Sequence, residues 1–525
     1  MRKNRPAALA AASFLLLAGT YIAAAPSAYA GTPGGTRAND RNTDFNGDGY
    51  DDVLVGAPGA TVGGHAGAGI VTVQYGAKSG MGTSRAAVFS QNTAGVPGAA
   101  EKGDAFGQAV ATGDLDGDGY DDAIVGVPGE DIGTVTDSGG GVVLWGSAKG
   151  LVGSASTVVK ADEPAAGRGL GSSLAAARFT DGGDGDLLAV LDSVGLTVFR
   201  YEAAPAARST AGAGGAGGVG KNLVRDSRTN FAPKAPKAKA PKGKAPSATA
   251  RAATLAAPTG IQPKSLTTGD YDANGFADLV VSGLSVGDES GDGWSYVIPG
   301  TASDAEPLPN LTLRGGPVAA SGDVNGDGKD DLVTGEPNSP DDDGPWTTGG
   351  MVGVHYGSAS GLTGEPQWWN QDTDAVPGTA EKGDAWGADL SVGDTNGDGF
   401  ADVAIGAPGE DIGTVTDAGA VWVMRGSALG LRTSDVRDFN QNSADVPGAA
   451  EKGDKFGGQV SFTDPNDDGR FGLLAAAPGE NTNDGVVWVF SAGSGGVTAA
   501  GSWTYGAGAL SAPSLDARFG SAIDD

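Results

Sequence analysis

Cysteine is absent from the 525-residue chain, so no disulfide bond can hold the fold together and no lipid-bearing cysteine can anchor it. Histidine is nearly absent, since the chain has two, His65 and His355, and this leaves few candidates for general acid–base catalysis. No run of about 18 apolar residues that could cross a membrane follows the N-terminal region. Metal ions are the obvious substitute for the missing covalent cross-links.

Positive charge is also scarce. The chain has 34 Lys and Arg residues against 64 Asp and Glu residues, which gives a formal net charge of −30. This charge becomes −33 when the three cations of the first 30 residues are removed. So acidic a surface repels the phosphate backbone, and we expect no nucleic-acid partner.

The first 30 residues have the features of a secretory signal peptide. Arg2, Lys3 and Arg5 precede an apolar stretch, and Ala28-Tyr29-Ala30 forms a cleavage site before Gly31. The apolar stretch is too short for a membrane span. We therefore predict a secreted, extracellular protein without a transmembrane segment.

A nine-residue phrase beginning Asp44-Phe-Asn46-Gly-Asp48-Gly49 occurs five times, starting at Asp44, Asp114, Asp270, Asp323 and Asp394. Carboxylates or amides occupy positions 1, 3, 5 and 9, and position 6 is Gly. Ca²⁺ takes six to eight oxygen ligands of this kind. We predict about five calcium sites, and the candidate ligands, with the seventh residue of each copy included, are Asp44, Asn46, Asp48, Tyr50, Asp52; Asp114, Asp116, Asp118, Tyr120, Asp122; Asp270, Asp272, Asn274, Phe276, Asp278; Asp323, Asn325, Asp327, Lys329, Asp331; and Asp394, Asn396, Asp398, Phe400, Asp402.

Two other interpretations of this phrase have to be weighed. An EF-hand needs a bidentate Glu at position 12, but the chain has β-branched residues there, in runs such as Asp402-Val-Ala-Ile405 that are typical of strands. The loop is therefore expected to join two strands. An Asx-rich turn without metal is the second alternative, but a plain turn would not need positions 3 and 9 in all five copies.

A longer repeat surrounds the acidic phrase. Phe106-Gly107, Trp386-Gly387 and Phe456-Gly457 precede it, and Gly56-Ala-Pro58, Gly126-Val-Pro128 and Gly406-Ala-Pro408 follow it. This arrangement resembles the FG-GAP repeat of the integrin α-subunit propeller. The resemblance implies an all-β fold, a seven-bladed β-propeller with four antiparallel strands per blade and calcium in hairpins at one rim.

The two ends of the chain suggest how such a ring would close. The first unit begins directly with its acidic loop, whereas Arg518-Phe519-Gly520 stands alone near the C-terminus. We infer that residues 518–525 complete the blade that begins at Asp44, so that no sheet edge remains open.

Two units depart from the pattern. The third has Arg178 where the first carboxylate belongs, and this cation would repel a metal ion. The seventh keeps Asp464, Asn466 and Asp468 but has Gly472 at position 9, so binding there should be weak.

The predicted organisation is a signal peptide over 1–30, blades one to three over 31–201, an insertion over 202–258, and blades four to seven with the closing strand over 259–525. The insertion is rich in Ala, Gly, Pro and Lys and is expected to be disordered. It is either a solvated loop or a cationic tether to an anionic envelope surface.

Candidates for catalysis are few. Gly283-Leu-Ser285-Val-Gly287 matches a nucleophile elbow, with His355 downstream, but a turn and a strand follow it instead of a helix. Glu130-Asp131 and Glu410-Asp411 are paired carboxylates that we expect in solvated loops. We predict a calcium-binding module, most simply a monomer, that adheres to an extracellular protein or glycan; the alternative is a secreted hydrolase on the same propeller.

Overall fold

The computed structural model describes residues 43–183, 185–203, 221–231, 258, 260–286, 291–303, 309–338, 348–362 and 364–524. The predicted signal peptide lies outside these residues. No helix among them is long and apolar enough to cross a membrane.

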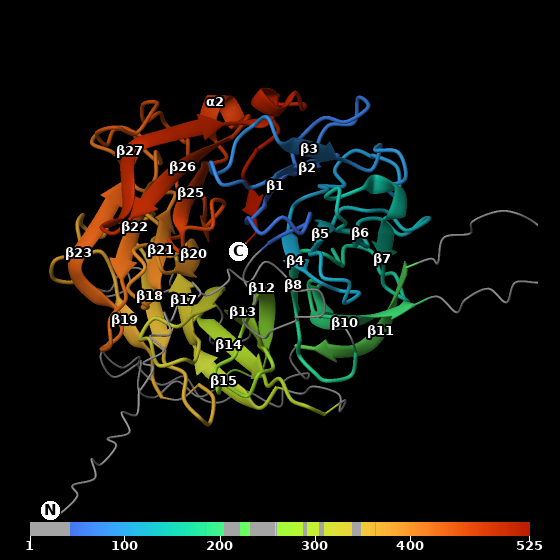
Figure 1. Ribbon diagram of the computed structural model, residues 1–525, viewed down its shortest axis with the longest axis horizontal. Helices are drawn as coiled ribbons and strands as arrows, with labels where there is room; N and C mark the ends of the chain where they lie inside the picture. The colour runs from blue at the N-terminus through green and yellow to red at the C-terminus, as the bar shows by residue number, and fades with distance from the viewer. Residues whose placement is uncertain are drawn as a thin grey trace, which may run out of the picture.

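Seven four-stranded antiparallel sheets form the molecule and are arranged around a common centre as the blades of a β-propeller (Figure 1). Blade one contains β28 (Ala522–Ile523), β1 (Val53–Ala57), β2 (Ile70–Gln74) and β3 (Ala86–Phe89); blade two β4 (Val110–Gly113), β5 (Asp122–Val127), β6 (Gly140–Leu144) and β7 (Thr157–Val159); blade three β8 (Ser173–Ala177), β9 (Leu187–Leu191), β10 (Gly195–Ala203) and β11 (Lys221–Asn230); blade four β12 (Ile261–Gly269), β13 (Asp278–Ser285), β14 (Gly293–Ile298) and β15 (Leu311–Arg314); blade five β16 (Val318–Gly322), β17 (Asp331–Glu336), β18 (Met351–His355) and β19 (Gln367–Trp369); blade six β20 (Asp389–Gly393), β21 (Asp402–Ala407), β22 (Ala420–Arg425) and β23 (Arg432–Phe439); and blade seven β24 (Gln459–Thr463), β25 (Gly472–Ala477), β26 (Val486–Gly493) and β27 (Gly496–Tyr505). The predicted all-β, seven-bladed fold is confirmed.

The C-terminal strand lies in the first blade. β28 pairs antiparallel with β1, and Val55 is opposite Ile523. The amide of Gly520 donates to the carbonyl of Gly56 (3.0 Å), and the amide of Leu54 donates to the Asp524 carboxylate (2.9 Å). In Figure 1 the end of the chain therefore lies beside the blue N-terminal strands.

The aromatic residue of each Phe-Gly pair anchors one blade against its neighbour. Phe106, Trp386, Phe456 and Phe519 are all fully buried. The Gly that follows has a structural role as well: Gly107 has φ +86°, and a Cβ there would lie 2.6 Å from the carbonyl oxygen of Ile70. A side chain at that position would therefore push two blades apart.

Blade three corrects the predicted insertion. Lys221–Asn230 form β11, which pairs with β10 along its whole length, so residues 202–258 are not a single disordered segment. Composition alone predicted that this segment would not pack. The cations of β11 nevertheless form ion pairs, Arg225 with Asp162 (3.0 Å) and Arg228 with Asp192 (2.6 Å). The remainder of the insertion, 204–220 and 232–257, lies outside the described residues, as does the predicted tether.

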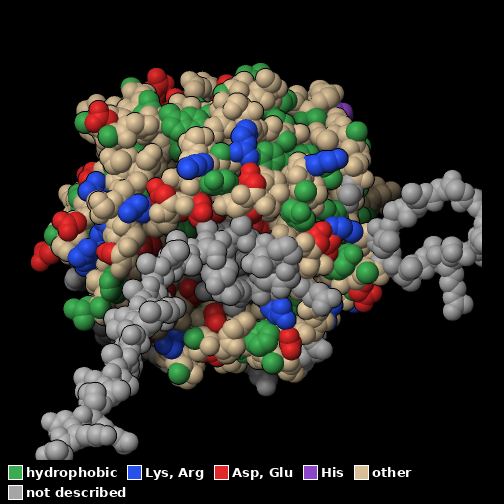
Figure 2. Space-filling model, viewed as in Figure 1, with side chains coloured by type: hydrophobic (Ala, Val, Ile, Leu, Met, Phe, Trp, Pro, Cys, Tyr) green, Lys and Arg blue, Asp and Glu red, His purple; other side chains and the backbone are tan. Residues whose placement is uncertain are grey.

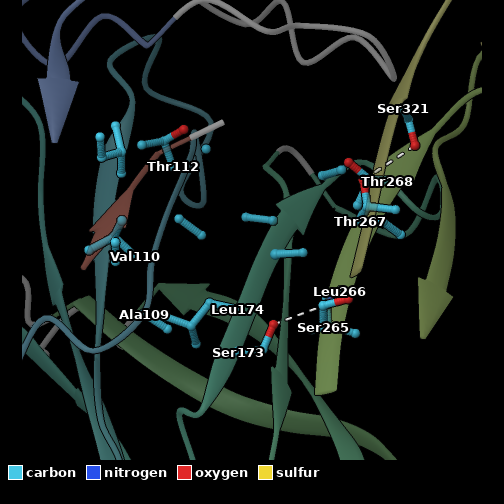
Figure 3. Close-up of a pocket in the computed structure, with 18 of the residues that line it drawn as sticks. Ala109, Val110, Thr112, Ser173, Leu174, Ser265, Leu266, Thr267, Thr268 and Ser321 are labelled. Carbon is cyan, nitrogen blue, oxygen red and sulfur yellow. Dashed lines mark hydrogen bonds between the residues drawn. The ribbon is translucent and has the colours of Figure 1, made fainter. Parts of the chain in front are cut away.

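The centre of the ring contains a cavity of about 450 Å³ lined by the first strands of the blades. Small and hydroxyl-bearing residues on these strands leave the space open, and several of them link neighbouring blades (Figure 3). Leu266 donates its amide proton to the Ser173 hydroxyl (3.1 Å), and the Thr267 and Ser321 hydroxyls lie 3.3 Å apart. These hydroxyl groups thus connect blade four to blades three and five.

Candidate metal centre

Each acidic loop, numbered by its blade, precedes the second strand of that blade. Loops two, four, five and six connect the first strand to the second, whereas loop one leads into β1 and the C-terminal segment supplies the first strand, β28. The first aspartate organises the loop: the Asp44 carboxylate accepts the backbone amides of Gly47 (2.7 Å), Asp48 (3.2 Å) and Gly49 (2.8 Å). Asp394 accepts the equivalent amides of Gly397, Asp398 and Gly399 at 2.8–3.3 Å. Because the backbone wraps around this carboxylate, the side chains of the loop are held close to one another.

The ninth-position aspartates fasten the loops to the sheet. Asp52 accepts the amides of Phe45 (3.0 Å) and Gly76 (2.9 Å), and Asp122 accepts those of Leu115 (3.0 Å) and Gly146 (2.9 Å). Asp278 and Asp331 are buried and each accept two amides in the same way, whereas the buried Asp402 accepts the amide of Gly426 and the hydroxyl of Thr395. These aspartates therefore have a structural role in addition to any metal ligation.

Loop two brings three predicted ligands together. Asp114, Asp116 and Asp122 each offer a carboxylate oxygen, and these oxygens lie within 4.8 Å of one another. Asp116 Oδ1 is buried and accepts no hydrogen bond. In loop five the amide oxygen Oδ1 of Asn325, also at position 3, is likewise buried without a partner. Such unused oxygens suit a hard cation like Ca²⁺.

Burial raises the pKa values of these carboxyl groups. For Asp52 burial is the main cause and the neighbouring charge of Asp44 adds to it, so that the pKa rises to about 8. Burial similarly raises the pKa of Asp278 and of Asp331 to about 7. The carboxylate form is thus unfavourable until a cation compensates it.

Lys221 reaches loop two from the neighbouring blade. Its ammonium group forms a short ion pair with Asp116, lies 3.4 Å from Asp118, and is 4.5 Å from the centre of the Trp145 ring. The sequence offered no signal for this contact, because Lys221 was assigned to the insertion. An internal cation therefore occupies part of the predicted calcium cage.

The residue at position 8 is a structural element that the sequence analysis missed. Asp121 accepts the amide of Asp44 in the preceding blade (2.7 Å), Asp330 that of Asp270 (2.9 Å), and Asp51 that of Asp464 (2.8 Å). The sequence feature that could have revealed these contacts is the Asp-Asp doublet at positions 8 and 9 of loops one, two and five. These aspartates connect successive loops around the rim.

The two degenerate loops differ from each other. In blade three the Arg178 guanidinium pairs with Asp181 (2.9 Å). In blade seven Asp464 still accepts the amides of Asp468 (3.1 Å) and Gly469 (2.7 Å), so the loop keeps its shape without a carboxylate at position 9.

The residues considered for hydrolysis do not form a catalytic arrangement. Ser285 is the last residue of β13, and its hydroxyl accepts a hydrogen bond from the amide of Asp292 (3.1 Å). His355 is buried on β18, with its ring nitrogens at the carbonyl oxygens of Arg314 (2.8 Å) and Gly364 (3.3 Å).

The space-filling view shows acidic and basic side chains interspersed on one face of the molecule (Figure 2).

Fold and loops together define a seven-bladed β-propeller. The FG-GAP repeat model matches residues 42–73, 106–144, 315–352 and 386–424, which lie in blades one, two, five and six. The chain therefore contains FG-GAP repeats and resembles the integrin α subunits.

Three known proteins are similar in sequence to part of this chain. Integrin alpha-6 of Homo sapiens is 36% identical over 116 residues, which are 22% of this chain and 9% of the relative. Integrin alpha-PS2 of Drosophila melanogaster is 30% identical over 175 residues, which are 32% of this chain and 12% of the relative. Phosphatidylinositol-glycan-specific phospholipase D of Mus musculus is 32% identical over 180 residues, which are 34% of this chain and 20% of the relative. The chain thus spans at most a fifth of the length of these relatives.

Proposed function

We propose that this protein is a secreted, calcium-stabilised propeller that acts as a binding or adhesion module for an extracellular protein or glycan. The convergence of Asp114, Asp116 and Asp122 within 4.8 Å is the observation that carries the calcium assignment. The same residue pattern in four further loops extends it around the ring. The signal-peptide pattern of residues 1–30 supports secretion.

The role of calcium in this proposal is structural. The side chains at positions 1, 3, 5 and 9 of each loop, with the backbone carbonyl of the seventh residue, would hold the ion. Bound calcium would neutralise carboxylates that are otherwise crowded at one rim. Sites of this kind in extracellular modules typically bind at about 10⁻⁴ to 10⁻³ M, which suits permanent occupancy in a calcium-bearing medium.

Calcium titration of the mature protein tests this assignment. We expect about five equivalents to bind to the loops, and Asp398→Asn should remove one of them. Asp435→Asn is a suitable control, because Asp435 is an exposed residue on β23 outside the loops. Absence of bound calcium at millimolar supply would refute the assignment.

The binding role rests on the fold and on its integrin-like repeats, and the loops of one face are the natural contact surface. A pull-down with the calcium-loaded protein, against envelope fractions of its source and surrounding material, tests this role. Failure to retain any protein or glycan would count against it.

The hydrolase alternative has the phospholipase D relative in its favour, although the match covers a fifth of that enzyme. A screen with ester and polysaccharide substrates discriminates between the two functions. Turnover that disappears in Ser285→Ala would favour the hydrolase.

A further inference from the structure

A glutamine, an aspartate and a glutamate recur together where one blade packs against the next. The Gln follows the fourth strand of one blade by two residues, whereas the Asp and the Glu belong to the following blade. We call these sets the junction triads: Gln91–Asp104–Glu130 between blades one and two, Gln371–Asp384–Glu410 between blades five and six, and Gln441–Asp454–Glu480 between blades six and seven.

The glutamine is oriented identically in all three triads. Its Nε2 donates to the glutamate, at 2.6 Å in Gln91–Glu130, 2.8 Å in Gln371–Glu410 and 2.6 Å in Gln441–Glu480. These glutamine residues are only 5%, 1% and 1% exposed, and their Oε1 atoms accept no hydrogen bond. A buried carbonyl oxygen without a donor is unfavourable, and the same cost recurs three times.

The carboxylates of each triad are also incompletely compensated. Asp104, Asp384 and Asp454 are 2–3% exposed. Each aspartate accepts a backbone amide, from Glu101 (2.5 Å), Glu381 (2.6 Å) and Glu451 (2.8 Å) respectively, and this neutral donor leaves the negative charge in place. Burial and the neighbouring charge of Asp454 raise the pKa of Glu480 to about 7. A cation between the two carboxylates would compensate both charges.

The glutamates correct an expectation from the sequence. Glu130 and Glu410 were assigned to solvated loops, but both are half-buried against the glutamine of the preceding blade, while Asp131 and Asp411 are exposed.

The junction between blades seven and one shows that the fold does not require these polar residues. Ala507, Ala517 and Ala60 occupy the positions of the Gln, the Asp and the Glu, and all three are buried in an apolar cluster. The backbone is nevertheless the same: Gly59 donates to the carbonyl of Ala517 (3.0 Å), as Gly129 does to that of Asp104 (3.1 Å). At these four junctions the three polar groups are present together or replaced together, which indicates a shared role.

We propose that each junction triad is a calcium site, in which the glutamine Oε1 and the aspartate and glutamate carboxylates are ligands. Each triad offers one neutral and two anionic oxygen donors. Oxygen ligands suit a hard cation such as Ca²⁺ better than they suit softer metals. Each ion would connect two blades, because the glutamine comes from one and the carboxylates from the next.

These sites are separate from the acidic loops. Glu130 follows the C-terminal end of β5, and Asp122 of loop two begins that strand. Six residues of extended chain span roughly 20 Å, so the triads lie toward the opposite face of the ring. The proposal does not depend on calcium binding by the acidic loops.

Crystals of the mature protein soaked in Sr²⁺, a heavier analogue of Ca²⁺, provide a direct test. We expect anomalous peaks bounded by the Gln, Asp and Glu of the three triads and none at Ala60. Peaks in the loops without peaks in the triads would overturn this proposal and leave the proposed function standing. Peaks in the triads alone would support this proposal and overturn the calcium assignment of the acidic loops.

A solution experiment separates a metal ion from a shared proton. The variant Glu130→Gln/Glu410→Gln/Glu480→Gln keeps the side-chain shape and should bind three fewer equivalents of Ca²⁺ by equilibrium dialysis. The matched control, Glu101→Gln/Glu381→Gln/Glu451→Gln, changes the same charge on exposed residues nearby and should bind as the parent does. Unchanged stoichiometry in the triad variant, with an unaltered melting temperature in calcium, would mean that a proton occupies these sites and the proposal is wrong.

Discussion

At the residue scale, the most informative contact is the one between Lys221 and loop two. The Asp116 side chain is 4% exposed and that of Lys221 is 24% exposed, so the pair is shielded from water on one side. The ammonium group compensates carboxylates that also form the predicted calcium cage. A cation supplied by the chain and a cation from solution then compete for the same oxygens.

Replacement of Lys221 by Gln should therefore strengthen calcium binding in loop two. We expect about a tenfold gain in affinity, which equals roughly 1.4 kcal/mol. Trp145 reports on this site, because the ammonium lies 4.5 Å from its ring, and calcium titration followed by tryptophan fluorescence measures the change. Lys221→Arg retains the charge and should leave the affinity near that of the parent; equal affinity in all three proteins would contradict the competition.

Loop four contains a strained residue. Ala273 has φ +57° at position 4, where loops one, two, five and six have Gly with φ between +68° and +74°. A left-handed conformation costs an L-residue roughly 1–2 kcal/mol, although Gly recovers only part of this because it is more flexible in the unfolded chain.

We accordingly expect Ala273→Gly to raise the free energy of unfolding by up to about 1 kcal/mol, as measured in urea. The reverse change at the equivalent position of loop one, Gly47→Ala, should be destabilising, because a Cβ there would also lie 2.6 Å from the ring of Tyr120. A loss of stability in Ala273→Gly would show that the strain is compensated elsewhere.

At the element scale, the C-terminal segment stabilises the ring more than its length suggests. β28 has two residues, yet the segment also inserts the fully buried Phe519 against Tyr505, with ring centres 5.4 Å apart. Aromatic side chains of this kind account for much of the packing energy between elements.

Phe519→Ala should lower the free energy of unfolding by about 3–5 kcal/mol, the usual cost of an aromatic cavity. Leu515→Ala is the matched control, since Leu515 lies four residues away and is 74% exposed. Thermal and urea unfolding of the two variants measure the difference. Similar stability of both proteins would mean that the segment is not part of the cooperative fold.

The sequence predicted those elements whose signals are local and repeated. The strand after each acidic loop, the buried Phe106 and Trp386, and the first and ninth aspartates could all be located from spacing alone. β11 could not, because its position depends on carboxylates of distant segments, such as Asp162 after β7. The junction triads were also missed, since Gln91 and Glu130 are 39 residues apart and meet only when two blades pack.

At the scale of the whole molecule, the balance of charge determines how stability responds to pH and calcium. The formal net charge of −30 counts buried carboxyl groups whose pKa values are raised, such as Asp52, as ionised. In unfolded chains the pKa of Asp is about 3.9. The calcium-free folded state therefore holds protons that the unfolded state releases.

Because of this difference, the stability of the calcium-free protein should fall as pH rises from about 4 through about 7–8. Asp278 and Asp331, with pKa values of about 7, contribute in the same direction as Asp52. With saturating calcium the carboxylates are compensated, so the fall should be much smaller. Melting temperatures at pH 5, 6.5 and 8, in metal-free and in calcium buffers, check the prediction; a metal-free protein that becomes more stable with rising pH would contradict it.

The pairing of Val55 with Ile523 has a consequence for biogenesis. β28 follows every other strand in the chain, so the first blade remains one strand short until the other six blades have been synthesised. Until then β1 keeps an open sheet edge, and the ring can close only as a late step of folding.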